Sequence, residues 1–162
     1  MVRKGKKARK TLVSKTRVRP LLRGRFETNS EEETFRLGEK LGRGFRPGAV
    51  AALAGEIGSG KTLFIKGLCK GMGVKDRDEV KSPTFVLLHL YKGKFPIHHF
   101  DLYRLERESE LDAIGFDDFL ANASAVSVIE WADRARPRIP ADALWIEFEI
   151  TGPTSRRIRI KK

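Results

Sequence analysis

The chain has 162 residues, of which 40% are hydrophobic, and this is enough for one domain with a core of its own. Its single cysteine, Cys69, excludes an internal disulfide, and no apolar run approaches the ~18 residues that a membrane-spanning helix needs. These totals predict a single small domain in the reducing cytoplasm, without membrane association.

The net charge of +12 is distributed unevenly. Residues 1–25 hold eleven Lys or Arg and no Asp or Glu, whereas residues 26–162 have a net charge of only +1. Because residues 1–25 also lack a sustained hydrophobic period, they are predicted to be a disordered basic arm in front of a folded domain, residues 26–162. The arm would either contact RNA or another partner or be a solvated tail. Attraction to RNA is expected from the arm and not from a basic face of the domain.

The first predicted element is a helix that starts after Ser30. Ser30 and Glu33 have the spacing of a capping box, in which each side chain bonds the other residue's backbone amide. Leu37 and Leu41 then fall on one helical face, and Gly42 is expected to end the helix.

A buried strand is predicted at residues 49–54, which are apolar without interruption. The glycine-rich segment 55–62 follows directly, and the apolar residues after it predict a helix over residues 61–72. Strand, glycine-rich loop and helix thus occur in the order that a phosphate-binding loop requires.

The rest of the chain alternates between predicted strands and helices. Strands are expected at residues 85–91, 97–102, 125–130, 144–150 and near 157–160, and helices around 107–113 and 117–121. The first two of these strands are too close for a parallel crossover and should form a hairpin. The sequence therefore predicts an α/β domain that is P-loop NTPase-like, with a mixed central sheet flanked by helices.

Segment 55–62 has the Walker A pattern Gly-x-x-x-x-Gly-Lys-Thr. Its glycines would let backbone amides turn toward phosphate oxygens at the positive end of the next helix. Lys61 is expected to reach the β- and γ-phosphates, and Thr62 to coordinate Mg²⁺. A structural glycine-rich turn is the alternative, but the flanking strand and helix favour nucleotide binding. The predicted nucleotide-binding residues of the loop are Gly55, Glu56, Ile57, Gly58, Ser59, Gly60, Lys61 and Thr62.

Two acidic residues, Asp101 and Glu130, each close an apolar run. In an α/β sheet such positions lie where the carboxyl ends of the strands meet the phosphates, and carboxylates there can hold Mg²⁺ and position water. Capping a helix or forming a surface ion pair is the alternative role. A histidine metal site at His98 and His99 is not expected, because adjacent residues of a strand point to opposite faces.

Three further motifs follow the Walker A loop in order. They are Lys81-Ser82-Pro83-Thr84-Phe85, His99-Phe100-Asp101-Leu102-Tyr103-Arg104 and Ile129-Glu130-Trp131. Together with the loop, these motifs resemble the TsaE family, also called YjeE, the small bacterial ATPases of tRNA threonylcarbamoyladenosine biosynthesis. The resemblance runs from about residue 34 to residue 159, and the basic arm is not part of it.

The resemblance implies that the chain binds and hydrolyses ATP with Mg²⁺. It implies that Thr84 acts near the γ-phosphate and the metal, that Asp101 is the Walker-B-like metal ligand, and that Glu130 supports hydrolysis. The implied metal ligands are Thr62, Asp101 and Glu130, and the implied catalytic residues are Glu130, Asp101 and Thr84.

Trp131 is implied to line the nucleotide site. Tyr103 and Arg104 belong to the same signature, and whether they contact nucleotide or a partner stays open. For Tyr103 a role in the core is equally compatible with the sequence.

The resemblance also implies a function with protein partners. ATP hydrolysis would support turnover of the TsaD–TsaB complex, which transfers a threonylcarbamoyl group to tRNA, and contact with tRNA would be indirect or through the arm. A small-molecule P-loop kinase is one alternative, because Arg134, Arg136 and Arg138 could cover phosphates as a lid. The other is an RNA-binding module whose affinity comes from residues 1–25.

Overall fold

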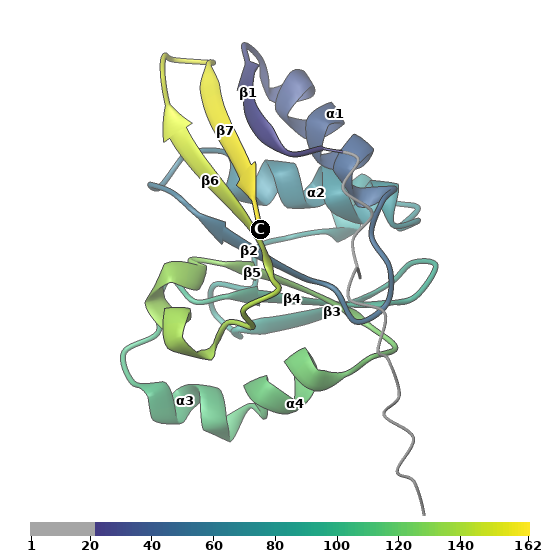
Figure 1. Ribbon diagram of the computed structural model, residues 1–162, viewed down its shortest axis with the longest axis vertical. Coiled ribbons are helices and arrows are strands. Elements are labelled where there is room, and N and C mark those ends of the chain that lie inside the picture. The colour runs from purple at the N-terminus through teal and green to yellow at the C-terminus, as the bar shows by residue number, and fades with distance from the viewer. Residues whose placement is uncertain (1–21) are drawn as a thin grey trace, which may run out of the picture.

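The structure is a computed structural model that describes residues 22–162, so residues 1–21 of the predicted arm lie outside the described residues. A seven-stranded sheet with the strand order β1-β7-β6-β2-β5-β4-β3 crosses the domain, and helices lie on both of its faces (Figure 1). Parallel and antiparallel pairs both occur in the sheet. The predicted α/β fold with a mixed central sheet is therefore confirmed.

Four strands run parallel in the middle of the sheet: β6 (Leu144–Ile150), β2 (Val50–Ala54), β5 (Val126–Glu130) and β4 (Pro96–Asp101). All of them were expected within one or two residues. Because they are parallel, their carboxyl ends meet at one edge of the sheet. This edge carries the glycine-rich loop that follows β2.

The predicted hairpin is formed by β4 and the antiparallel edge strand β3 (Leu88–Lys92). β3 begins three residues later than expected, because residues 84–87 form a turn in which Leu87 has a φ of 64°. A leucine with positive φ cannot continue a strand. Residues 85–87 of the expected strand therefore lie in this turn, which begins at Thr84.

Strand β1 (Gly24–Thr28) adds an element that the sequence did not predict. It pairs antiparallel with β7 (Arg156–Lys161) at the other edge of the sheet, and Leu22 and Phe26 pack against the core. Gly24 and Arg25 thus lie in the fold, and the folded part begins before the boundary expected at residue 26.

Helices α1 (Glu31–Gly42) and α2 (Lys61–Gly71) cover one face of the sheet (Figure 1). Ser30 caps α1 by accepting a hydrogen bond from the Glu33 amide at 3.1 Å. The two helices approach backbone to backbone: a Cβ atom added to Gly38 would lie 2.3 Å from the Phe64 carbonyl oxygen.

The other face is covered by α3 (Glu108–Ala113), α4 (Phe116–Ala121) and the 3₁₀ helix η2 (Ala132–Arg138). A short 3₁₀ turn, η1 (Arg77–Glu79), follows α2. Buried apolar side chains form one cluster under α1 and α2 and a second cluster under the opposite layer. Within residues 22–162 no helix has both the length and the apolar character to cross a membrane.

Candidate nucleotide-binding site

The glycine-rich segment 55–62, which joins β2 to α2 and includes the first two residues of that helix, wraps around the end of one lysine side chain. Gly58 and Gly60 have φ values of 73° and 97°, which lie in the left-handed region that favours glycine. The Lys61 Nζ atom donates hydrogen bonds to the carbonyl oxygens of Gly55 at 2.7 Å and Glu56 at 2.8 Å. A positive charge therefore lies at the centre of the loop.

Lys61 is only 5% exposed, and its Nζ atom lies 4.0 Å from the ring centre of Trp131. Burial lowers the pKa of Lys61, while the negative charges of Glu130 and Asp101 act in the opposite direction. The amine thus has neutral oxygen acceptors and an aromatic face around it. An anionic ligand in the loop would give this cation a stronger partner.

Glu130, at the end of β5, connects the loop to the sheet. Thr62, in the first turn of α2, donates its hydroxyl hydrogen to Glu130 Oε2 at 2.9 Å, and His99 Nε2 lies 2.8 Å from Glu130 Oε1. On the other side of the imidazole ring, the Tyr91 hydroxyl lies 3.3 Å from His99 Nδ1 and donates to the Lys81 carbonyl oxygen at 2.8 Å. Burial raises the pKa of Tyr91 to about 12, so this phenol stays a donor at neutral pH.

Asp101 ends β4, and the sheet register pairs it with Glu130 on β5. Its carboxylate accepts hydrogen bonds from the Thr84 hydroxyl at 2.7 Å, from the Ser82 hydroxyl, and from the Tyr103 amide at 2.9 Å. Asp101 and Glu130 are each 2% exposed. Two buried carboxylates therefore lie side by side at the carboxyl edge, each held by hydroxyl donors.

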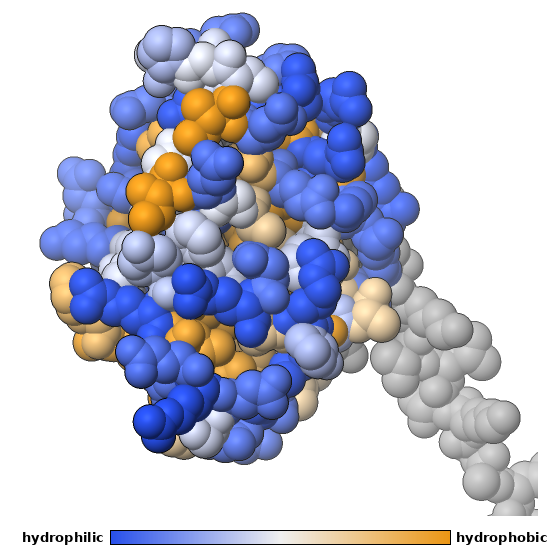
Figure 2. All heavy atoms as spheres, turned by 90° about the vertical axis from the view of Figure 1, so that its left-hand side faces the viewer, coloured by the Kyte–Doolittle hydropathy of each residue, from blue (hydrophilic) through white to orange (hydrophobic). Residues whose placement is uncertain are grey.

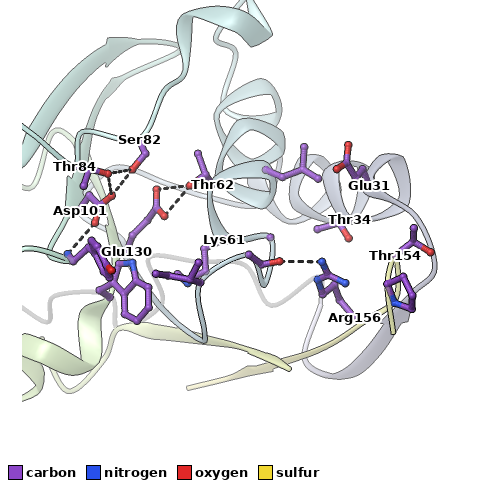
Figure 3. Close-up of a pocket in the computed structure, with 17 residues that line it drawn as sticks. Glu31, Thr34, Lys61, Thr62, Ser82, Thr84, Asp101, Glu130, Thr154 and Arg156 are labelled. Carbon is purple, nitrogen blue, oxygen red and sulfur yellow. Dashed lines mark hydrogen bonds between the residues drawn. The ribbon is translucent and has the colours of Figure 1, made fainter. Parts of the chain in front are cut away.

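A cleft of about 480 Å³ opens over these groups. Besides the loop and the carboxylates, it is lined by Glu31 and Thr34 of α1 and by Thr154, between β6 and β7 (Figure 3). Its volume lies in the range of small-molecule and cofactor sites. Residues from both halves of the chain thus form one elongated site with Lys61 near its middle.

The residues present fit a nucleotide with Mg²⁺. Within the described part of the chain, no cluster of three or more His, Cys, Asp or Glu side chains could hold a metal by itself. Mg²⁺ is commonly held by one or two carboxylates and a hydroxyl together with the phosphates of its substrate. Thr62, Asp101 and Glu130 supply such an incomplete oxygen set beside the glycine-rich loop.

The structure brings most of the predicted site residues together, but not the three arginines that could have formed a lid in a small-molecule kinase. Arg134 donates to the Leu105 carbonyl oxygen at 3.3 Å and lies near the rings of Tyr103 and Trp131. Arg136 instead stacks on the Trp145 ring, and Arg138 forms ion pairs with Asp112 and Asp117. These contacts hold the three side chains in different places.

Tyr103 and Arg104, the motif residues that follow Asp101, make contacts in different places. The Tyr103 ring packs against the Trp131 ring with 5.0 Å between their centres, whereas Arg104 lies over the ring of Phe85. Phe85 is 83% exposed. Figure 2, which views the side where β2 enters the loop, shows a mostly hydrophilic surface with separate hydrophobic patches.

Two contributors to the site were not singled out from the sequence. Arg156, the first residue of β7, donates to the carbonyl oxygens of Ser59 at 3.1 Å and Gly58 at 2.9 Å, and thereby holds the loop from outside (Figure 3). His99 begins one of the motifs that carry the family resemblance, but no role was assigned to it and a metal site there was not expected; it is the partner of Glu130. Its place two residues before Asp101 in a strand, and so on the same face, was the available signal, whereas nothing local marks Arg156.

Comparison with known proteins gives a consistent result. The family described as threonylcarbamoyl adenosine biosynthesis protein TsaE matches residues 28–158. The tRNA threonylcarbamoyladenosine biosynthesis protein TsaE of Treponema pallidum is 34% identical over 84% of this chain and 98% of its own length. The protein of the same name from Aquifex aeolicus is 35% identical over 81% of this chain and 90% of its own length.

A solved structure agrees with these sequence matches. The crystal structure of YdiB from Bacillus subtilis superposes with a TM-score of 0.67 and 27% sequence identity, covering 84% of this chain and 82% of that chain. Family match, relatives and structure all span the glycine-rich loop, both carboxylates and most of the sheet. The chain belongs to the TsaE family.

Proposed function

We propose that this protein is a Mg²⁺-dependent ATPase that acts in the biosynthesis of threonylcarbamoyladenosine in tRNA. The relatives are named for that biosynthesis, which supports the pathway. The observation that carries the ATPase proposal is the position of Lys61, buried inside the glycine loop and beside the paired carboxylates Asp101 and Glu130.

The proposed mechanism assigns a task to each group. The loop amides and Lys61 bind the phosphates and orient the terminal one, as in other P-loop proteins. Thr62, Asp101 and Glu130 would hold Mg²⁺, which would supply positive charge next to the phosphates. Glu130, fixed by His99, orients the attacking water, and Thr84 lies close enough to Asp101 to act at the same end of the nucleotide. Trp131 closes the site over Lys61 and excludes water from it.

Hydrolysis would serve a larger assembly. We place the protein in the cytoplasm with TsaD and TsaB as partners, where ATP turnover resets the complex that modifies tRNA. The group transfer itself would belong to the partners, and this chain would supply the nucleotide-dependent turnover.

The test measures phosphate release from ATP by the full chain with Mg²⁺, alone and with TsaD and TsaB. The Asp101→Ala/Glu130→Ala variant should lose at least about 100-fold in rate, because both carboxylates act on the same phosphate. Full activity in this variant would refute the site, and transfer of phosphate to an added metabolite in place of water would establish the small-molecule kinase.

A further inference from the structure

The side chain of Tyr91, on the edge strand β3, is buried but is not among the residues that line the cleft. Side chains alternate between the two faces of a strand, so four side chains share the sheet face under α1 and α2: Tyr91, His99, Asp101 and Glu130. A phenylalanine would fill the same space in the core, and burying a hydroxyl group costs free energy unless it is hydrogen-bonded. The contacts of the hydroxyl group therefore decide what Tyr91 contributes.

The Tyr91 hydroxyl binds the backbone of Lys81 twice. It donates to the Lys81 carbonyl oxygen at 2.8 Å and accepts from the Lys81 amide at 3.2 Å. Residues 81–83 belong to no helix or strand, so these two bonds attach Lys81 to the sheet. Ser82 and Thr84, which follow closely in the chain, donate their hydroxyl hydrogens to the Asp101 carboxylate (Figure 3). Tyr91 thus holds the start of the segment that holds Asp101.

Two imidazole rings approach the same hydroxyl oxygen. His99 Nδ1 lies 3.3 Å from it, and His89 Nδ1 lies 3.2 Å from it. The other ring nitrogen of His99, Nε2, lies 2.8 Å from Glu130 Oε1. One oxygen atom of Tyr91 therefore connects the segment that holds Asp101 with the side chain that holds Glu130.

We propose that Tyr91 is a positioning residue for ATP hydrolysis, whose hydroxyl fixes Lys81 relative to His99 and thereby fixes the two carboxylates of the cleft relative to each other. This inference rests on the proposed function. Groups that act on one phosphate must keep their places to within a fraction of an ångström, and hydrogen bonds from residues behind them provide that precision. Because Tyr91 does not line the cleft, loss of its hydroxyl should affect the hydrolysis step and not nucleotide binding.

The test compares Tyr91→Phe with the parent protein, both as full chains. The substitution removes one oxygen atom and keeps the ring in the core. The kcat of ATP hydrolysis should fall about fivefold, the loss expected for one net hydrogen bond, while KM and the Kd for a non-hydrolysable ATP analogue should change by less than about twofold. Without any nucleotide, the Lys81 backbone amide should exchange its hydrogen with solvent at least about fivefold faster, because its acceptor is gone.

The matched control is Ile97→Val, because Ile97 lies directly opposite Tyr91 on β4 and is fully buried. It removes one CH₂ group from the same part of the core and should also lower stability to urea. Its kcat and the exchange rate of the Lys81 amide should match those of the parent protein. Equal kcat losses in the two variants would overturn the proposal, since the effect would then follow stability, as would unchanged exchange at Lys81 in Tyr91→Phe.

A double variant tests the connection through His99. Tyr91→Phe combined with His99→Ala should lower kcat by less than the product of the two separate reductions, because the hydroxyl acts on Glu130 through the imidazole. A reduction equal to that product would overturn the proposal.

The outcomes also separate this proposal from the ATPase proposal. Hydrolysis that persists without Asp101 and Glu130 would refute the proposed site and this inference with it. Hydrolysis that depends on both carboxylates but not on the Tyr91 hydroxyl would overturn this inference alone.

Discussion

The cleft beside the glycine loop and the outer face of the β1–β7 pair hold their charged side chains in different ways. In the cleft, Lys61, Asp101 and Glu130 are buried, and each has several hydrogen-bond partners within the chain. On the outer face of the β1–β7 pair, Arg25 and Arg159 are exposed, lie opposite each other and have no such partners among the described residues. A buried polar group must be satisfied before its ligand arrives, whereas an exposed one is satisfied by water until a partner displaces it. The fold therefore fixes the charged groups of the cleft in place, whereas it leaves the side chains of Arg25 and Arg159 to water.

The largest expected effect tests the cleft. Lys61→Ala removes a buried cation that no other side chain can replace, and it should weaken binding of a non-hydrolysable ATP analogue by about 100-fold, or about 2–4 kcal/mol. Titration calorimetry measures this change. Lys70→Ala, at an exposed position of the same helix, should bind like the parent protein. A Lys61→Ala variant within threefold of the parent would remove the lysine from nucleotide binding.

The next effect concerns how Glu130 is held. His99→Ala leaves the buried Glu130 carboxylate without one of its two donors, and should lower the free energy of unfolding by about 1–3 kcal/mol. It should also lower kcat of ATP hydrolysis about tenfold, with KM changed by less than about threefold, because the role proposed for Glu130 lies in the hydrolysis step. His99→Gln, which keeps a donor, should recover part of kcat.

The neighbouring histidine is the control for this prediction. His98 lies on the opposite face of β4 against the Phe119 ring, so His98→Gln should leave kcat unchanged. Stability and kcat can be measured on the same preparations by urea unfolding and phosphate release. Equal kcat values in His99→Ala and His98→Gln would show that His99 has no influence on hydrolysis.

A smaller effect on ATP affinity is expected from Arg156, which contacts the glycine loop from outside the cleft. Arg156→Met removes the bonds to the carbonyl oxygens of Gly58 and Ser59, which fix two peptide planes of the loop. The Kd for ATP should rise about fivefold, equivalent to about 1 kcal/mol. Arg157→Met, one residue along and bonded only to exposed acids, should have no measurable effect on nucleotide affinity.

The smallest expected effect concerns the exposed pair of Arg25 and Arg159, which lie opposite each other on β1 and β7. Arg25→Glu replaces a repelling cross-strand pair with an attracting one, and should raise the free energy of unfolding by a few tenths of a kcal/mol. Thermal and urea unfolding at low salt measure the gain. Arg25→Glu combined with Arg159→Glu restores repulsion and should lose that gain. A single variant that is less stable than the parent protein would mean that Arg25 has a stabilising contact in the fold.

Features that depend on residues close together in the sequence could be predicted from it, whereas features that depend on distant residues could not. The glycine loop, Lys61 and the capped start of α1 depend on neighbours within a few residues, so their patterns are visible locally. Strand β1 depends on pairing with β7, more than 100 residues away, and contributes little apolar sequence of its own apart from Phe26. The role of Arg156 likewise exists only after β7 has been placed beside the loop. Neither the sequence of β1 nor that of β7 alone shows that the two strands pair, or in which register.

The packing of α1 on α2 limits which sequences this fold can accept. At Gly38, Gly42, Gly67 and Gly71, an added methyl group would lie between 2.1 and 2.3 Å from a backbone oxygen of the facing helix. Backbone cannot move aside as a flexible side chain can, so even alanine would push the two helices apart. Substitutions by larger residues are therefore not tolerated at these positions without a shift of one helix against the other. In a library of random substitutions, they should be among the least tolerant positions outside the site, although they carry no functional group.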